Sequence, residues 1–361
     1  MRPRSSEEEE EQTVALRPNT RRVLITGGAG FVGSHLAERL VRDGAQVRIL
    51  DNLTTGRTEN LSALEREPNL EVVAGDITDF GLVDRLVAES DMVFHLAAAV
   101  GVKLILADAI GSFRTNVIGT ENIFESSHRH NVKVLIASTS EVYGKVVKLP
   151  QREDDDVLIG STAVSRWSYA AQKMLDEFIG LAYHRQGLPV IIFRLFNTVG
   201  PRQTGRYGMV VPRFVDAALH GRQIEVYGDG KQSRCFLHVH DAVEALVRLS
   251  ENDRAVGQVF NVGSTESVTI RELAKRVVAA TRGDTSASAM KAAVRYVPYD
   301  VAYPTGGYED IRARVPDTGK LHSITRWRPK WTLEATLADI VAERRQSIAL
   351  TNPEAVASAV A

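Results

Sequence analysis

The chain has 361 residues, of which 44% are hydrophobic and 25% are charged, as in an ordinary soluble protein with one large or two modest domains. Its 44 Lys and Arg balance 45 Asp and Glu, so the net charge of -1 provides no basic surface for nucleic acid or an anionic membrane. The single cysteine, Cys235, excludes an intramolecular disulfide, and no apolar run has the length of a signal peptide or a membrane span. We therefore expect a cytoplasmic protein in which Cys235 is a buried apolar residue.

Residues 1–20 contain the acidic block "SSEEEEEQ", which we expect to be disordered and solvated. From residue 21 to 197, apolar runs of strand length alternate with amphipathic stretches of helix length. The strand-like runs include "RRVLITG", "QVRILD", "LEVVAGD", "DMVFHLA", "VKVLIAST" and "PVIIFRLFN". Continuous Val, Ile and Leu runs joined by helices are typical of parallel strands that are buried on both faces. The sequence therefore predicts an α/β fold with a doubly wound parallel sheet of the Rossmann type.

The composition changes after Asn197. Residues 198–234 are rich in Gly, Pro, Arg and aromatic residues, whereas "VFNVGS" at 259–264 again resembles a strand of the main sheet. We therefore predict a Rossmann domain formed by 21–197 and about 237–264. A smaller, discontinuous C-terminal substrate domain is predicted from about 198–236 and 265–345, followed by a C-terminal tail at 346–361.

The first strand-like run leads into a glycine-rich turn. In "VLITGGAGFVGSHLAERL" the glycines at positions 27, 28, 30 and 33 lie between a strand and a helix. Such a turn lets backbone amides approach a pyrophosphate at the helix N-terminus without a Cβ in the way. A glycine pattern alone also occurs in tight turns that bind nothing, but here the strand and the helix are both present. The stretch therefore predicts a dinucleotide site.

Acidic residues follow the next two strands. Asp51 lies 18 residues after Gly33, the separation expected for a carboxylate that binds the adenosine ribose. Its charge favours NAD over NADP, although Arg57 leaves NADP open. Asp76 in "AGDITD" either reaches the adenine amino group or lies at a helix N-terminus that is capped by Asp76 or by Thr78. His95 is a core histidine or a site residue, and we assign it no role.

Tyr169 and Lys173 lie four residues apart in the predicted helix "WSYAAQKMLDEF", so they share one face. A phenol with a pKa of about 10 is a poor base at neutral pH, but a nearby ammonium group and a nicotinamide ring would both lower that pKa. Tyr169 would then accept a proton from a sugar hydroxyl. The same spacing also occurs by chance on many helices. It indicates a catalytic pair here because it follows the nucleotide-binding motif in the same chain.

Together these segments resemble the extended short-chain dehydrogenase/reductases that act on nucleotide sugars. The matching stretches span about residues 22–345 and include "TGGAGFVG", "GDITD", "NVIGTEN", "STSEVYG", "YAAQK", "RLFNTVGPR", "VYGDGKQSR" and "HVHDAVEAL". The resemblance implies bound NAD, a UDP-sugar substrate and a transient 4-keto sugar. It also implies a homodimer that packs through a four-helix interface near 108–128 and 168–184.

The resemblance assigns residues to three roles. Catalytic residues would be Thr139, Ser140, Glu141, Tyr169, Lys173 and Arg314. Cofactor residues would be Gly27, Gly30, Phe31, Val32, Gly33, Asp51, Asn52, Asp76, Ile77, Leu96, Ala97, Ala98 and Asn116, with Tyr169 and Lys173. Substrate residues would be Asn197, Arg213, Tyr227, Arg234 and Arg314, because guanidinium groups bind phosphate through two parallel hydrogen bonds. We expect no metal, since "HVH" at 238–240 lacks a third ligand and Asp241 is interpreted as a helix N-cap.

The two residues after Thr139 indicate the reaction. Ser140 and Glu141 complete a Thr-Ser-Glu pattern that is similar to UDP-glucuronate decarboxylases, with Arg314 in "RVPD" as the assisting arginine and Arg312 as the substitute. We therefore expect NAD-dependent decarboxylation of UDP-glucuronate to UDP-xylose, UDP-4-keto-xylose or both. The alternatives are a UDP-sugar 4-epimerase, then a 4,6-dehydratase, then a non-catalytic NAD-binding module.

Overall fold

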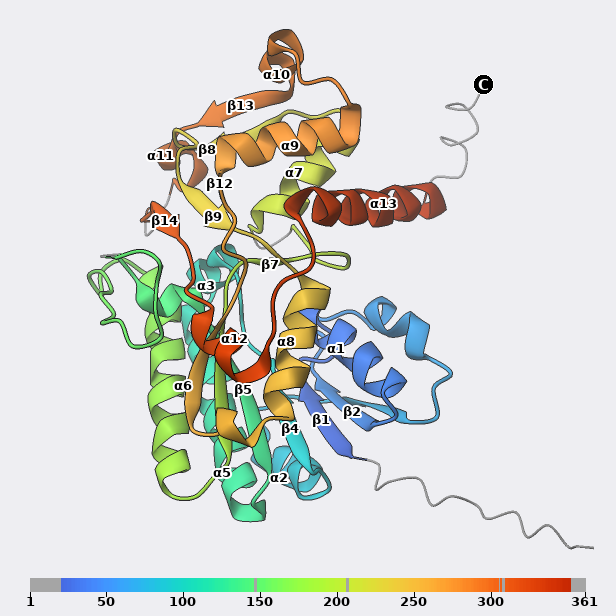
Figure 1. Cartoon of the computed structure of the whole chain (residues 1–361), viewed down its shortest axis with the longest axis vertical. Coiled ribbons are helices and arrows are strands. Elements are labelled where there is room, and N and C mark those ends of the chain that lie inside the picture. Colours follow the sequence, from blue (N-terminus) through green and yellow to red (C-terminus); the bar gives the residue numbers. More distant parts are fainter. Residues whose placement is uncertain (1–20, 146–147, 206–207, 305, 307–308, 352–361) are drawn as a thin grey trace, which may run out of the picture.

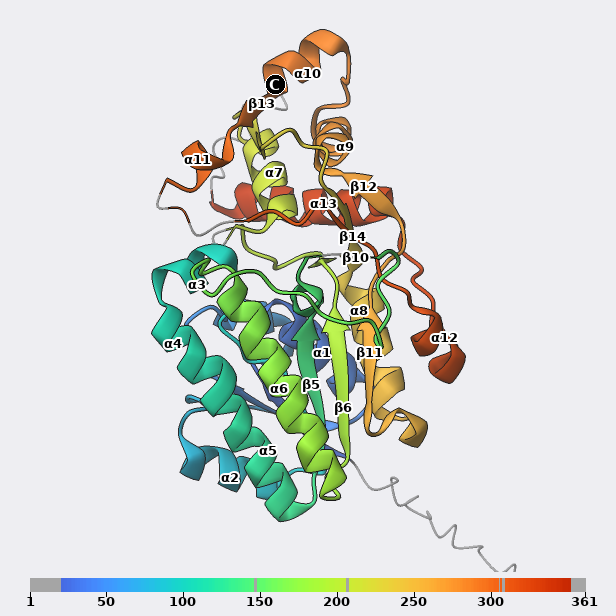
Figure 2. The same cartoon turned by 90° about the vertical axis from the view of Figure 1, so that its left-hand side faces the viewer.

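The computed structural model describes residues 21–351 except 146–147, 206–207, 305 and 307–308. A seven-stranded sheet lies at one end of the molecule (Figures 1 and 2), with the strand order β11-β6-β5-β4-β1-β2-β3 and parallel pairing throughout. Its strands are β1 (Arg22–Thr26), β2 (Gln46–Asp51), β3 (Leu70–Ala74), β4 (Met92–His95), β5 (Lys133–Thr139), β6 (Val190–Leu195) and β11 (Gln258–Val262). This confirms the predicted doubly wound sheet and the return of the chain to it near residue 259.

Helices cover both faces of this sheet. On one face, α1 (Phe31–Arg42) and α8 (Val239–Ser250) share a core with the strands, in which Leu36, Leu246 and Phe260 are fully buried. On the other face lie α2 (Phe80–Ala88), α5 (Gly119–His130) and α6 (Trp167–Arg185). The strand order reverses between β1 and β4, and ligands of open α/β sheets bind beyond the carboxyl ends of the strands at such a point.

Short elements connect the larger strands and helices. They are η1 (Thr58–Leu64), α3 (Val102–Ala107), α4 (Ala109–Phe113), the π-helical turn η2 (Arg114–Ile118), η3 (Ser140–Tyr143) and η4 (Asp253–Ala255). The turn η3 begins at the residue that follows the last residue of β5. It therefore carries the "STSEVYG" segment to the carboxyl end of an inner strand.

A second part of the chain has its own core and lies at the opposite end of the molecule (Figure 1). Its helices are α7 (Val210–Leu219), α9 (Ile270–Arg282), α10 (Ala287–Ala293), α11 (Tyr299–Ala302) and α13 (Leu333–Thr351). Its short strands are β7 (Thr198–Val199), β8 (Ile224–Tyr227), β9 (Ser233–Cys235), β10 (Leu237–His238), β12 (Ser267–Thr269), β13 (Val294–Val297) and β14 (Ala313–Arg314). We propose these two parts as the two domains, and their exact boundaries remain a prediction.

Two segments differ from the predicted division. The helix α12 (Gly319–Thr325) and Trp327 pack in the core of the seven-stranded sheet, although residues 265–345 were assigned to the substrate domain. The helix α13 continues to Thr351, so the first residues of the predicted C-terminal tail are helical. The predicted acidic tail at 1–20 and residues 352–361 lie outside the described residues.

Candidate active site

The turn from β1 to α1 forms a cradle of backbone. Gly27 has φ of +71°, and a Cβ on it would lie 2.7 Å from the backbone nitrogen of Ala97. A Cβ on Gly33 would lie 2.3 Å from the carbonyl oxygen of Gly27. Only glycine fits either position, and the N-cap of α1 is Gly30, so the first amides of the helix are not covered by a capping side chain. This geometry fits a dinucleotide pyrophosphate.

Asp51 ends β2 beside this cradle and is buried. Its two carboxylate oxygens accept backbone N–H groups from Ala29 at 2.9 Å and Leu53 at 2.8 Å. Burial raises the pKa of Asp51, although these two hydrogen bonds act in the opposite direction. The carboxylate therefore connects the glycine-rich turn to the loop after β2, in the position predicted for a ribose ligand.

Asp76 and Asn116 do not line the main cavity, although both were predicted to contact the cofactor. Asp76 accepts hydrogen bonds from Thr78 and from the side chain of Asn52. Its alternative role as a helix cap, alone or with Thr78, is wrong, because Asp79 caps α2. Asn116 is fully buried and bonds to the backbone of Ala99, so it fixes the loop after β4.

A single cavity of about 570 Å³ joins the glycine-rich cradle to the second part of the chain. Every other residue predicted for the site lines it. These are Gly27, Gly30, Phe31, Val32, Gly33, Asp51, Asn52, Ile77, Leu96, Ala97, Ala98, Thr139, Ser140, Glu141, Tyr169, Lys173, Asn197, Arg213, Tyr227, Arg234 and Arg314. The fold thus brings together residues from segments nearly 300 positions apart (314 minus 27 is 287).

Tyr169 and Lys173 lie on α6 facing this cavity, as their spacing predicts. The pKa of Tyr169 is raised, whereas the sequence predicts a lowered one. Burial is the largest cause, followed by the negative charges of Glu141 and Asp176, while a hydrogen bond with Thr139 acts in the opposite direction. The ammonium of Lys173 is 3.0 Å from the carboxylate of Asp176. This pairing was not predicted, because the sequence motif contains only the tyrosine and the lysine.

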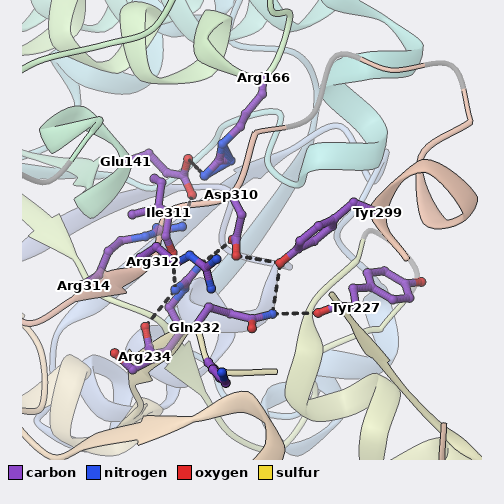
Figure 3. A network of polar contacts seen from close by, with 12 residues as sticks. Glu141, Arg166, Tyr227, Gln232, Arg234, Tyr299, Asp310, Ile311, Arg312 and Arg314 are labelled. Atoms are coloured by element: carbon purple, nitrogen blue, oxygen red, sulfur yellow. Dashed lines mark hydrogen bonds and ion pairs between the residues drawn. The ribbon is translucent and has the colours of Figure 1, made fainter. Parts of the chain in front are cut away.

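Glu141 lies between two buried arginines (Figure 3). One of its oxygens is 2.7 Å from a guanidinium nitrogen of Arg314, and the other is 3.1 Å from one of Arg166. Arg314 also donates to the hydroxyl of Ser140 at 3.2 Å. Burial alone would raise the pKa of Glu141, but the positive charges of Arg314, Arg166 and then Arg234 outweigh it and lower the pKa. Glu141 is therefore an ionised carboxylate.

Arg166 was not predicted as a site residue. It lies immediately before α6 and three residues before Tyr169, with only 3% of its side chain exposed. The spacing to Tyr169 places both side chains on one side of the helix start, which is the signal that the sequence offered. Arg312, the predicted substitute for Arg314, pairs with Asp229 near the surface, with 75% of its side chain exposed. Of the two candidates, Arg314 and not Arg312 lines the cavity as described.

The remaining predicted substrate ligands lie on β8, β9 and α7 and in the segment between β6 and β7. Arg213 stacks over the ring of Tyr227 at 4.3 Å, and Asn197 donates to the carbonyl of Cys235 at 3.0 Å. Arg234 is 9% exposed and contacts the carboxylate of Asp310 at 3.2 Å. These groups face the cavity and supply positive charge and donors suited to a diphosphate.

A polar network that the sequence did not predict supports Arg234 (Figure 3). Tyr299 donates to Asp310 at 2.6 Å, and Gln232 donates to the backbone carbonyl of Tyr227 at 2.9 Å and to Tyr299 at 3.2 Å. Its members come from β8, β9, α11 and the segment before β14. Tyr227 and Asp310 are 83 residues apart in the chain, so only the tertiary fold brings the members of this network together.

The "HVH" segment has a structural role. His238 stacks on Trp331 with ring centroids 3.8 Å apart and contacts Asp339 at 3.0 Å. It is also the N-cap of α8, so the prediction that Asp241 caps this helix is wrong. Asp241 instead accepts two backbone N–H groups, from Lys330 and Trp331, each at 2.9 Å. Among the described residues, no group of three potential metal ligands occurs.

Cys235 is buried, as predicted, and burial raises the pKa of its thiol to about 12. It is therefore not an activated nucleophile. Within residues 21–351 as described, no helix combines the length and apolarity that a bilayer crossing requires.

Comparisons with known proteins agree with this geometry. The chain is 42% identical to UDP-N-acetyl-alpha-D-glucosaminuronate decarboxylase of Bacillus cytotoxicus, over 89% of this chain and 97% of the relative. It is 36% identical to UDP-glucuronic acid decarboxylase 1 of Arabidopsis thaliana, over 91% of this chain and 70% of the relative. The crystal structure of DesIV, a dTDP-glucose 4,6-dehydratase from Streptomyces venezuelae with NAD bound, has a TM-score of 0.80 and 30% identity, over 91% of this chain and 98% of DesIV. The family model described as GDP-mannose 4,6 dehydratase matches residues 24–340. The chain therefore belongs to this family of extended short-chain dehydrogenase/reductases.

Proposed function

We propose that this enzyme is an NAD-dependent decarboxylase of a UDP-linked hexuronic acid, with UDP-glucuronate as its substrate. The observation that carries the proposal is the cluster of Arg166, Glu141 and Arg314 beside Tyr169. Two buried guanidinium groups face one carboxylate there, and the side chains that line the cavity include seven Lys or Arg against four Asp or Glu. A second carboxylate, on the sugar, would be stabilised at this position. The names of the relatives, which include decarboxylases of two UDP-linked uronic acids, support the same chemistry.

The cradle at Gly27, Gly30 and Gly33 and the carboxylate of Asp51 fit NAD, and a relative in the family binds it. NAD bound there would supply a hydride acceptor for the oxidation at C4 of the sugar and a hydride donor for its later reduction. We assign Tyr169 as the base that takes the proton from the C4 hydroxyl, with Thr139 as a hydrogen-bond partner of the same oxygen. Lys173 binds the nicotinamide ribose and supplies the positive charge that stabilises the phenolate.

Oxidation at C4 makes the sugar carboxylate labile. The carboxylate at C6 is then β to a ketone, so the C5–C6 bond breaks with its electron pair passing to the C4 oxygen, and carbon dioxide leaves. Tyr169 and Thr139 are placed to stabilise the resulting enolate oxygen. A proton must then reach C5. Because the pKa of Glu141 is lowered, we assign Glu141 to orient the arginines and a protonating water rather than to donate the proton itself.

A second substrate is favoured by a specific observation. The Bacillus cytotoxicus relative is more similar in sequence than the plant decarboxylases and is named for an N-acetylated uronic acid. UDP-N-acetylglucosaminuronate has the same C4 hydroxyl and C6 carboxylate, so the proposed chemistry applies to it unchanged. The two substrates differ only at C2.

A UDP-sugar 4-epimerase remains the alternative reaction. Hydride removal and return need no group at C6, so a buried pair of arginines has no evident role in a neutral hexose epimerase. A 4,6-dehydratase is disfavoured because the family resemblance implies that dehydratases have an acidic Asp at the position of Ser140.

The proposal is tested by parallel incubations of the purified enzyme with UDP-glucuronate and UDP-N-acetylglucosaminuronate. Release of carbon dioxide and formation of a UDP-pentose or its 4-keto form from at least one of them supports the proposal, and the ratio of kcat/KM identifies the sugar. Tyr169→Phe is the matched control and should reduce turnover by at least about 100-fold. Recovery of a C4 epimer with an intact carboxylate would establish an epimerase instead.

A further inference from the structure

A second buried ion pair lies in the site, on α6, between Lys173 and Asp176. The lysine nitrogen is 3.0 Å from a carboxylate oxygen of Asp176, and the two side chains are 3% and 1% exposed. We propose that Asp176 is a positioning residue that holds the ammonium of Lys173 in place and thereby sets the pH range in which Tyr169 acts as a base. This inference rests on the proposed role of Tyr169, while its test below does not require a sugar substrate.

The geometry explains why Lys173 needs this partner. A buried ammonium without a hydrogen-bond acceptor would cost several kcal/mol. Asp176 lies one helical turn further along the same face, so the pair closes locally and fixes the long lysine side chain. The ammonium has three N–H donors, and the contact with Asp176 occupies one of them. Two donors then remain for a ribose hydroxyl and the phenolate.

The other titratable groups around the pair are held neutral or are already paired. His95 lies near Lys173, and both of its ring nitrogens are hydrogen-bonded, to Thr26 at 2.7 Å and to Thr120 at 2.9 Å. Burial, and then the charge of Lys173, lower the pKa of His95 to about 3, so it is neutral at physiological pH. The hydroxyl of Thr120 itself donates to the backbone carbonyl of Asn116.

Glu177 is the neighbour of Asp176, and it serves a different partner. It makes a two-pronged ion pair with Arg194 of β6, at 2.9 and 2.7 Å, and it accepts from the hydroxyl of Ser138. Its charge is therefore compensated within the core. Asp176 and Glu177 are consecutive buried carboxylates on one helix, but only the first contacts the lysine of the site among the contacts described for residues 21–351.

Lys173 and Asp176 have opposite effects on the ionisation of the Tyr169 phenol. Lys173 lies one helical turn after Tyr169 on α6, and Arg166 and Arg314 both pair with Glu141. The negative charges of Glu141 and Asp176 disfavour the phenolate of Tyr169, whereas the positive charge of Lys173 favours it. Asp176→Asn keeps an oxygen that accepts the hydrogen bond of the ammonium, but it removes the negative charge. The phenol would then ionise at lower pH, and the rate limited by its ionisation would reach its plateau at lower pH.

The experiment uses the NAD-loaded enzyme and the variant Asp176→Asn. The ionisation of Tyr169 is isolated as the difference in phenolate absorbance between each protein and the same protein with Tyr169→Phe, followed as a function of pH. We expect the midpoint to fall by about one pH unit in Asp176→Asn. Asp176→Glu keeps the charge and should restore the wild-type midpoint. Glu177→Gln is the matched control, with an unchanged midpoint even if the protein is less stable.

Equal midpoints in the wild type and in folded Asp176→Asn would overturn the proposal, as would an equal shift in Glu177→Gln. If Asp176→Asn does not fold, Asp176→Ser removes the same charge with a smaller side chain. Its phenolate midpoint is then compared with the wild type in the same way. The pH dependence of the first hydride transfer from UDP-glucuronate should shift in parallel. If the wild type does not turn over that sugar, the proposed function fails, while the phenolate titration still decides the role of Asp176.

Discussion

At the scale of single residues, the site is organised around one carboxylate between two guanidinium groups. Arg166 and Arg314 hold Glu141 at 3.1 and 2.7 Å, and all three side chains are largely buried. In water such pairs contribute little, but in a buried site they keep each other ionised and fixed. Two arginines beside one carboxylate can stabilise a further anion. We therefore propose that the sugar carboxylate binds beside them.

Arg166→Gln tests this connection directly. The loss of one charge-assisted hydrogen bond of about 1.5–3 kcal/mol should weaken binding of UDP-glucuronate about 10- to 100-fold, with little change for the uncharged analogue UDP-glucose. Calorimetric titration of the NAD-loaded enzyme with both ligands measures the difference. Arg312→Gln, on an exposed arginine outside the cavity, is the control and should bind both ligands like the wild type. Equal losses for both ligands would refute a carboxylate contact.

Glu141→Gln should have two separable effects. It leaves two buried arginines without their counter-charge, so the free energy of unfolding should fall by about 3 kcal/mol, as measured by urea denaturation. NAD should remain bound, and the first hydride transfer should still occur, but later steps should slow by about 100-fold. Rapid mixing with UDP-glucuronate would then show accumulation of the reduced nicotinamide. A fully active variant would make Glu141 a structural residue only.

The sequence predicted those site residues that belong to local motifs. Thr139, Tyr169 and Lys173 follow from a strand end and from a spacing of four on a helix, which are properties of adjacent residues. Arg166 and Asp176 were missed although they flank the same motif, because their importance comes from partners in space. Asn116, which was predicted to contact the cofactor, bonds to the backbone of Ala99, and its role toward the cofactor stays a prediction.

At the scale of elements, the site depends on how the two parts of the chain are joined. The helix α8 follows β10 and packs on α1, and its buried Asp241 accepts two backbone N–H groups from the turn before α13. This contact connects the core of the seven-stranded sheet with the last helix of the second part.

Asp241→Ala should therefore destabilise the protein. Two backbone donors lose a charged acceptor, so the free energy of unfolding should fall by about 2–3 kcal/mol in urea denaturation. The control is Asp253→Ala, which removes an exposed carboxylate from an ion pair with Lys133 and should change stability by less than about 1 kcal/mol. Similar effects for the two variants would contradict the assigned contact.

Strands and helices were predicted well where periodicity and burial agree, as in β4, β5 and β6, whose apolar runs are buried on both faces. Helix ends were predicted poorly. Asp76, Thr78 and Asp79 are all good capping residues within four positions, and the sequence does not distinguish which one has its side chain directed at the free amides. The extent of α13 was also missed, and its last turns are largely exposed, so burial does not explain them.

At the scale of the whole molecule, one apolar face is uncovered in the single chain. Exposed apolar residues lie on α4, η2 and α6, and they include Ile110, Phe113, Ile118, Leu175 and Phe178. They fall in the two segments for which the resemblance implies a four-helix dimer interface. We therefore propose a homodimer with this face buried.

Phe178→Asp should disrupt this dimer. Phe178 is 69% exposed in the single chain, so the substitution should leave the fold of one subunit intact while placing a charge in the interface. Sedimentation velocity should then show a monomer, against a dimer for the wild type. Val301→Asp, on a similarly exposed residue of α11 away from this face, is the control. A monomeric wild type would contradict the interface.

The central claim is that carbon dioxide leaves the sugar before a proton reaches C5 beside Glu141. It is tested most directly by incubating the wild-type enzyme with UDP-glucuronate in deuterated water and following the products by NMR. Our account predicts release of carbon dioxide and a UDP-xylose or UDP-4-keto-xylose that carries one solvent deuterium at C5. Recovery of UDP-galacturonate, with its carboxylate intact and no deuterium at C5, would contradict it.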